Sequence, residues 1–174
     1  EFECRKRWLT NYSPIQEVLY SQIGREIQCS VCANVVTNIE NTCIFYIDPV
    51  YDVESAIRRH FQPLFQNDWR CDKCGNLSNH NRTTCYITKI PKVIVLCIKR
   101  FGIDGKSKTK QNNDIPKRID VKKYLKIPQP RTQYTLSSVV EHVGSLNYGH
   151  YYTTVITDSK IITIDDETIK ISHE

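Results

Sequence analysis

Two histidines and two aspartates in the last third of the chain have the types and spacing of an acid–base site. His142 and His150 flank a glycine-punctuated loop, and Asp165 and Asp166 follow further along. An imidazole that is oriented by a carboxylate through one ring nitrogen has its other nitrogen free to deprotonate a nucleophile. The segment therefore predicts the base half of a nucleophilic enzyme.

Two strands are predicted to bring these side chains together, at residues 151–157 and 161–164, with a turn at 158–160. His150 then lies at the open end of one strand and the aspartates at the open end of the other, where neighbours are about 5–8 Å apart. Because alternate side chains point to opposite faces, we expect only one aspartate to face His150. The pattern leaves the register open. The simpler alternative is a loop histidine beside a turn-forming Asp pair.

Four of the eight cysteines form two C-x-x-C pairs, Cys29/Cys32 and Cys71/Cys74, which are separated by 38 residues. Four thiolates provide a closed tetrahedral zinc site, which is typical of a structural role. Metal binding in a reducing compartment is favoured over the alternatives, which are disulfides or four free buried thiols. The other cysteines, Cys4, Cys43, Cys85 and Cys97, lack such pairing.

Composition limits the class of protein. The 174 residues suffice for one domain with a core, and the absence of methionine predicts a piece of a longer protein. The net charge is +5, and residues 92–131 contain twelve Lys and Arg against three Asp. No aromatic residues interleave with the lysines at 106–110, so we expect no nucleic-acid partner. No apolar run approaches the ~20 residues of a membrane span, so we expect no membrane partner.

The remaining pattern predicts an α+β fold with mainly antiparallel strands. One helix is predicted to start at Ser13-Pro14 and to end at Gly24, and a second to start at Asp52 and to stop before Pro63. Residues 93–98 are continuously apolar, which indicates a strand buried on both faces. Further strands are predicted at residues 43–47 and 134–140.

The motif His142-x-Gly144-Ser145-x-x-x-Gly149-His150-Tyr151 resembles the histidine box of the ubiquitin-specific proteases. Residues 90–101 resemble that family's proline-led strand ending in Lys-Arg-Phe, and residues 164–169 resemble its closing segment. The two cysteine pairs have the order and approximate spacing of its zinc-bearing fingers. The resemblance covers about residues 13–171. Ile161 and Ile164 depart from it, since the family usually has Trp and another aromatic there.

The resemblance implies a papain-like cysteine protease fold, with residues 1–174 as a single partial catalytic domain. The zinc-bearing fingers would span residues 24–90, and the palm with the histidine box would span residues 91–174. Four cysteines would hold a structural zinc ion: Cys29, Cys32, Cys71 and Cys74.

The implied function is the removal of ubiquitin from proteins, with ubiquitin and ubiquitinated proteins as partners. His150 would be the general base, Asp165 would orient it, and Asp166 would be an auxiliary polar group. Gly149 and Tyr151 would help to bind ubiquitin's extended C-terminal tail. His142 would lie in a flexible loop and take no part in catalysis. The reducing compartment would be the cytoplasm and/or nucleus.

The nucleophile is the main departure from the family pattern. The family's Gly-led Asn-Thr-Cys-Tyr box does not precede Cys29. Asn41-Thr42-Cys43 looks similar, but it leads into a strand-like segment, whereas a thiolate nucleophile benefits from a helix N-terminus. We therefore expect the nucleophile upstream of this chain and no activity from the chain alone. The alternatives are a catalytically dead pseudo-protease held by zinc that binds ubiquitin or another partner, and a zinc-dependent interaction module unrelated to ubiquitin.

Overall fold

The structure, a computed structural model, describes residues 13–102, 107–109, 114–145 and 147–173. Its elements in chain order are α2 (Pro14–Leu19), β1 (Ser21–Gln28), β2 (Val35–Thr42), β3 (Phe45–Ile47), α3 (Val53–His60), β4 (Leu64–Gln66), β5 (Trp69–Arg70), β6 (Leu77–Ser78), β7 (Asn81–Lys89), β8 (Leu96–Ile98), β9 (Arg118–Asp120), the 3-10 helix η1 (Lys122–Tyr124), β10 (Gln133–Thr135), β11 (Ser138–Gly144), β12 (Gly149–Ile156), β13 (Lys160–Asp165) and β14 (Thr168–His173).

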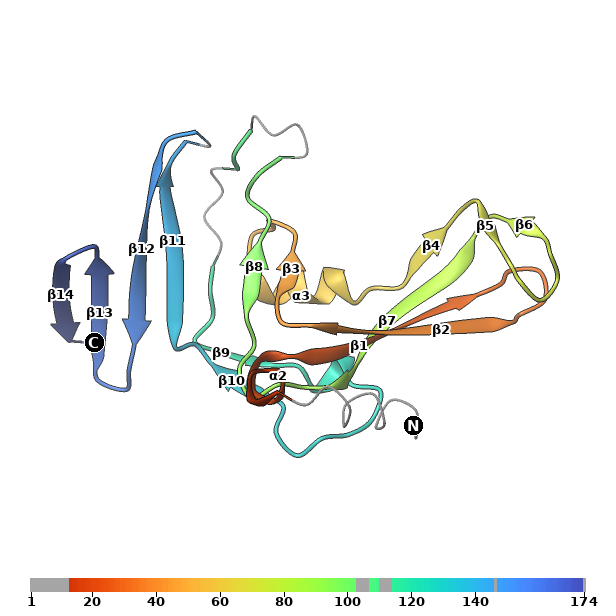
Figure 1. Ribbon diagram of the computed structural model, residues 1–174, viewed down its shortest axis with the longest axis horizontal. Helices are drawn as coiled ribbons and strands as arrows, with labels where there is room; N and C mark the ends of the chain where they lie inside the picture. Colours follow the sequence, from red (N-terminus) through yellow and green to blue (C-terminus); the bar gives the residue numbers. More distant parts are fainter. Residues whose placement is uncertain (1–12, 103–106, 110–113, 146, 174) are drawn as a thin grey trace.

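Two four-stranded antiparallel sheets lie on opposite sides of the molecule. The first has the order β2-β1-β7-β4 and forms a long arm that ends near β5 and β6 (Figure 1). The second has the order β11-β12-β13-β14, and β3, β8 and α3 lie between the two sheets (Figure 1). The predicted antiparallel α+β architecture is confirmed, with the parallel pair β3–β8 as an exception among the described strands.

Both predicted helices form, but the first is shorter than expected. Asp52 caps α3, because its carboxylate accepts a 2.7 Å hydrogen bond from the backbone N–H of Ser55. The prediction that Gly24 ends the first helix is wrong: α2 ends at Leu19, and Gly24 lies within β1. The ring of Tyr86 covers Gly24 so closely that a Cβ there would lie 2.2 Å from the ring. This glycine therefore makes room for a cross-strand aromatic residue.

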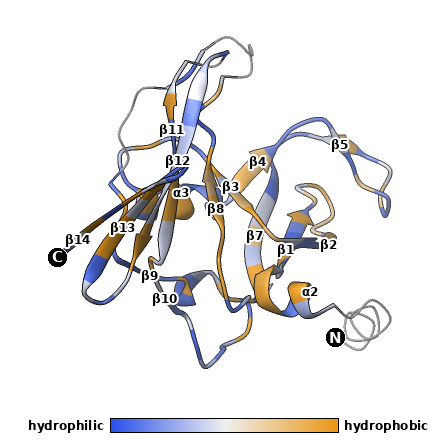
Figure 2. Ribbon diagram, turned by 60° about the vertical axis from the view of Figure 1, so that its left-hand side comes forward, coloured by the Kyte–Doolittle hydropathy of each residue, from blue (hydrophilic) through white to orange (hydrophobic). Residues whose placement is uncertain are grey.

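Two strand predictions need correction. Within residues 93–98 only 96–98 form a strand. Cys97 is exposed, as is its partner Tyr46 in β3, because this face of the pair is not covered. Figure 2 shows that β8 is hydrophobic. This hydrophobic character is the reason that the sequence pattern indicated a strand buried on both faces. The strand predicted at 134–140 is two strands, β10 and β11. They belong to different sheets. Between the two strands, the backbone N–H of Leu136 donates a hydrogen bond to the carbonyl of Lys117.

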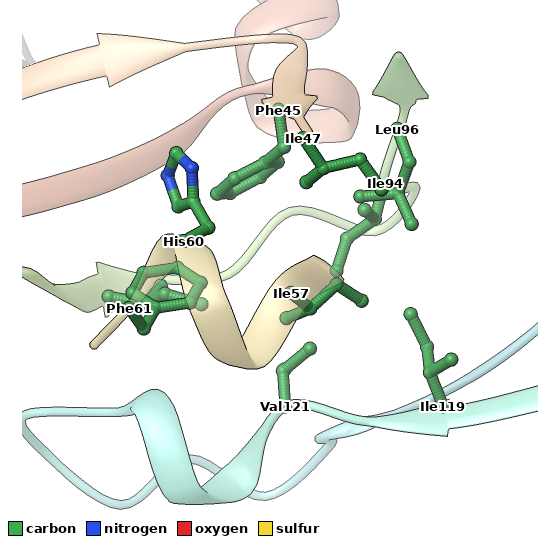
Figure 3. A pocket seen from close by; sticks show the side chains of 10 residues that line it. Phe45, Ile47, Ile57, His60, Phe61, Ile94, Leu96, Ile119 and Val121 are labelled. Atoms are coloured by element: carbon green, nitrogen blue, oxygen red, sulfur yellow. The ribbon is translucent and has the colours of Figure 1, made fainter. Parts of the chain in front are cut away.

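The core lies where α3 packs against β3 and β8. Two clusters of buried side chains meet there, and partly buried residues such as Phe61 and Leu96 contact both. An apolar cavity of about 10 Å³ lies between these elements. Figure 3 shows the side chains that line it, and the ring of His60 is among them. Burial lowers the pKa of His60, and Lys99 adds to this, so His60 is a neutral packing residue.

No helix in the described part of the chain is long and apolar enough to span a membrane.

Candidate active site and metal-binding cysteine cluster

The hairpin of β12 and β13 brings His150 to Asp165. Its register pairs Thr153 with Ile164, which places Tyr152 opposite Asp165 and His150 on the adjacent diagonal. Since His150, Tyr152 and Asp165 share one face of the sheet, the imidazole and the carboxylate meet. Nε2 of His150 hydrogen-bonds to Oδ1 of Asp165. The structure therefore resolves the register that the sequence left open.

Asp166 also reaches this site, which corrects the expectation that only one aspartate faces His150. One ligand atom from each of His150, Asp165 and Asp166 lies within 4.8 Å of the others. Strand alternation does not apply to Asp166, because β14 pairs with β13 through Asp165 and Thr168 and leaves Asp166 in the two-residue turn between them. Its φ of 49° is left-handed, a conformation that Asp tolerates better than most residues.

The electrostatics of the pair suit an imidazole that takes up a proton. The hydrogen bond to Asp165 raises the pKa of His150, and the charges of Asp165 and then Asp166 add to this. The two side chains of the pair are about half exposed, at 49% and 48%. Because Nε2 is occupied by Asp165, Nδ1 is the nitrogen left to accept a proton from a nucleophile.

A second pair on the same face was not found from the sequence. The hydroxyl of Tyr152 donates a 2.8 Å hydrogen bond to Glu141 on β11, and this bond raises the pKa of Tyr152. The two residues are direct cross-strand partners. The sequence signal that could have found Tyr152 is the alternation of side chains along a strand, because a residue two positions after His150 lies on the same face of the sheet.

His142 occupies a different position from the one the family resemblance implies. It lies in β11 opposite Tyr151 and not in a loop. Its ring contacts that of Tyr151 in a tilted arrangement with centroids 4.5 Å apart, on the sheet face opposite His150. Gly149 and Tyr151 precede and follow His150 in β12, and their predicted role in substrate binding stays a prediction.

The four paired cysteines converge on one point at the far end of the long arm. One sulfur atom from each lies within 4.8 Å of the others, with Sγ–Sγ distances of 3.9 Å for Cys29–Cys74 and 3.7 Å for Cys32–Cys71. A tetrahedral ion with Zn–S bonds of about 2.3 Å would separate its sulfurs by about 3.8 Å. The cluster therefore has the donors and the size for a metal ion.

The backbone around each pair forms the same tight turn. The N–H of Cys29 bonds to the carbonyl of Asn34, and the N–H of Cys71 bonds to that of Asn76. The residue after each second cysteine is left-handed, with φ of 57° at Ala33 and 71° at Gly75. These two turns are the knuckles predicted from the C-x-x-C pairs. A hydrogen bond from the backbone N–H of Cys32 lowers the pKa of Cys29 to about 6. Against a hydrogen bond from the backbone N–H of Asn34, burial and the three neighbouring cysteines raise the pKa of Cys32 to about 11. Four thiolates this close together need a cation to balance their charge.

Asn81 joins the first knuckle to the strands β4 and β6, and it was missed by sequence reasoning. It is fully buried, and its Oδ1 accepts bonds from the backbone N–H of Ser30 at 3.1 Å and from the hydroxyl of Ser78 at 2.8 Å. Its Nδ2 donates to the carbonyls of Gln66 and Ser78. Only the tertiary fold brings the segments of Ser30, Gln66 and Ser78–Asn81 together, so no local motif identifies Asn81.

None of the seven cysteines in the described residues hydrogen-bonds to His150. Cys43 is the residue with a nucleophile-like neighbourhood in sequence, but it precedes β3 and not a helix. Cys4 lies outside the described residues.

Comparison with known protein families identifies the family of this chain. The profile of the family described as "Ubiquitin carboxyl-terminal hydrolase" matches residues 3–174, and the chain belongs to this family. A probable ubiquitin carboxyl-terminal hydrolase, R319, of Acanthamoeba polyphaga mimivirus is 27% identical over 87% of the chain and 36% of its own length. Ubiquitin carboxyl-terminal hydrolase 4 of Arabidopsis thaliana is 25% identical over 92% of the chain and 46% of its own length. The chain thus spans less than half of either relative.

Solved structures confirm the papain-like fold of the ubiquitin-specific proteases. A chain in the structure of the SAGA Ubp8/Sgf11/Sus1/Sgf73 DUB module bound to ubiquitin aldehyde matches 94% of this chain with a TM-score of 0.80. A chain in a structure of the yeast SAGA DUB module with a mutant Sgf73 matches 98% of it with a TM-score of 0.83. Both are 20% identical to this chain, which covers 40% and 41% of them.

Proposed function

We propose that the complete protein is a cysteine-type deubiquitinase that hydrolyses the bond at the C-terminus of ubiquitin. The observation that carries this proposal is the His150–Asp165 hydrogen bond, made in a chain of the ubiquitin carboxyl-terminal hydrolase family. Ubiquitin and ubiquitinated proteins are the proposed partners. The nucleophile is a cysteine from outside the described residues, since no described cysteine bonds to His150.

The reaction would proceed through a thioester. Nδ1 of His150 takes the proton of the thiol, and the thiolate attacks the carbonyl carbon at the C-terminus of ubiquitin. As the bond to the amine breaks, His150 returns this proton to the leaving nitrogen. Water then adds to the thioester with His150 again as base, which releases ubiquitin and restores the thiol. Asp165 holds the ring throughout and stabilises its protonated form.

The metal in the cysteine cluster would be a structural zinc ion. The four sulfurs close the coordination shell, which leaves no position for water or substrate. This ion would hold the two knuckles at the end of the arm, consistent with a grip on the body of ubiquitin. Four free thiolate ligands need a reducing environment, so we also propose the cytoplasm and/or nucleus as the compartment.

Hydrolysis of a fluorogenic ubiquitin C-terminal amide by the complete protein tests the proposal. We expect activity in the parent protein, and a loss of at least about 100-fold in kcat on His150→Gln, because removal of a general base typically costs 10²–10⁴-fold. Lys170→Met, a change at an exposed lysine of β14, is the control and should keep full activity.

The second candidate is a catalytically dead pseudo-protease that binds ubiquitin or another partner. The lack of a described cysteine beside His150 is the observation that supports it, and the family match favours it over an unrelated zinc module. Ubiquitin binding by the complete protein, without any hydrolysis, would support this candidate. Absence of both ubiquitin binding and hydrolysis would exclude the deubiquitinase and the ubiquitin-binding form of the second candidate.

A further inference from the structure

The ammonium group of Lys108 makes three polar contacts to strand β11, which forms a hairpin with the strand that carries His150. Its Nζ lies 2.9 Å from Nδ1 of His142, 3.0 Å from the carbonyl oxygen of His142 and 2.8 Å from that of Gly144. An ammonium group has three donors and no acceptor. Nδ1 of His142 must therefore accept, which makes the ring neutral with its proton on Nε2.

The ring of His142, fixed in this way, contacts both chain neighbours of His150. It packs against the ring of Tyr151 in a tilted arrangement, and it lies so close to Gly149 that a Cβ there would be 1.9 Å from Nε2. These contacts are on the face of the sheet opposite the His150 imidazole. His142 thus supports the backbone of His150 from behind.

The segment after β8 supplies the other side of this support. Phe101 presents its ring to His142 at 5.9 Å in an edge-on arrangement, and it forms a β-bridge with Lys108. The guanidinium of Arg100 donates to the carbonyl of Thr109, which holds the returning segment close to β8. Lys108 therefore links the hairpin to a segment that is itself anchored to the core region.

Charge and burial agree with a neutral His142. Burial lowers the pKa of His142, and Lys108 and then Arg100 lower it further. Both cations belong to the segment after β8. From β12 the ring faces the ring of Tyr151 and the backbone of Gly149.

We propose that Lys108 and His142 are positioning residues, which fix the place of His150 in the reaction through Gly149 and Tyr151. The inference rests on the proposed function for its kinetic consequence, but its structural part does not. Neither residue touches the reacting atoms. They act because a shift of about 1 Å in a catalytic group can reduce the rate by about 100-fold.

Two measurements on the complete protein test this inference. Hydrogen–deuterium exchange of the peptide that covers residues 147–153 reports the hairpin without any need for activity. Steady-state kinetics report kcat and KM separately. The variants are Lys108→Met, which leaves three acceptors unpaired, His142→Gln, Lys108→Arg as the conservative change, and Lys170→Met as the control for loss of one lysine charge.

For Lys108→Met we expect at least tenfold faster exchange in this peptide and at least a tenfold lower kcat, with KM changed less than threefold. His142→Gln should show the same pattern, and Lys108→Arg should recover part of both losses. Unchanged exchange in both Lys108→Met and His142→Gln would overturn the inference, as would a change that Lys170→Met reproduces. A parent protein without hydrolase activity would count against the proposed function alone, because the exchange measurement would still decide whether the pair holds the hairpin.

Discussion

The two nitrogens of the His150 ring have different roles. Nε2 bonds to Asp165, and Nδ1 is open to a nucleophile. The raised pKa of His150 means that the pair stabilises the fold fully at pH values below about 6.5, the ordinary value for histidine, where the ring is charged in both folded and unfolded chains. That contribution is lost as the pH rises through the folded pKa. Both side chains are half exposed, so we expect the pair to contribute little to stability.

Replacing the carboxylate tests this assignment. Asp165→Asn should lower the pKa of His150 from its raised value, because the charge-assisted bond is lost while Asp166 remains. Titration of the ring Cε1–H by NMR on histidine-labelled protein measures the change. Asp158→Asn, in the exposed turn between β12 and β13, is the matched control. A His150 pKa equal in Asp165→Asn and the parent would contradict the role of Asp165.

The sequence predicted which residues form this site, but it did not predict all of their contacts. The histidine box and the Asp pair locate His150, Asp165 and Asp166, because strand ends in a hairpin are necessarily close. The approach of Asp166 was not predictable, since it depends on a left-handed turn residue. The contact between Lys108 and His142 spans 34 positions and belongs to no motif.

At the scale of elements, the two knuckles depend on a buried amide as well as on their cysteines. The C-x-x-C pairs predicted the cluster because four sulfurs must converge to coordinate one ion. The first knuckle lies between β1 and β2, and the second lies between β5 and β6. These strands and β7 were not predicted, since β1, β2 and β7 lack a strong period-2 pattern and β5 and β6 have two residues each. The buried Asn81 and Tyr86 over Gly24 become visible only once these strands are paired.

Asn81→Ala should destabilise the arm. The change leaves the N–H of Ser30 and the carbonyl of Ser78 without their buried partner, and such losses cost about 1–3 kcal/mol each. Urea unfolding with metal present measures the effect, and competition with a chromogenic chelator measures metal affinity. Asn79→Ala, at an exposed position nearby, should change either quantity by less than about 1 kcal/mol. Equal effects of the two substitutions would remove Asn81 from this role.

At the scale of the whole molecule, the metal that we propose for the cysteine cluster would contribute to the fold of the long arm. The buried hydrophobic clusters include Ile23 and Ile87 of the arm's strands β1 and β7, where these pack against the elements between the two sheets. The far end of the arm contains instead the buried sulfurs of Cys29 and Cys71. The predicted division into fingers at 24–90 and palm at 91–174 stays a prediction. The positions of β1–β7 and of β11–β14 are the structural features that such a division would follow.

Metal removal should therefore unfold this region. We expect about one zinc ion per chain, because four cysteines form one closed site. Chelation should abolish much of the strand signal in circular dichroism, since structural zinc contributes about 10 kcal/mol or more. Cys71→Ser should have the same effect, and Cys97→Ser, at an exposed cysteine outside the cluster, should not. Equal stability with and without a strong chelator would exclude a structural metal.

Covalent capture by a ubiquitin suicide probe is the most direct test of the central claim. A probe with a thiol-reactive group at the C-terminus of ubiquitin should form an adduct with the complete protein, detected as a mass shift and mapped to one cysteine by peptide sequencing. His150→Gln should slow adduct formation at least tenfold, because the thiol loses its base. Absence of any adduct in the folded, zinc-loaded parent protein would contradict the assignment as a cysteine deubiquitinase.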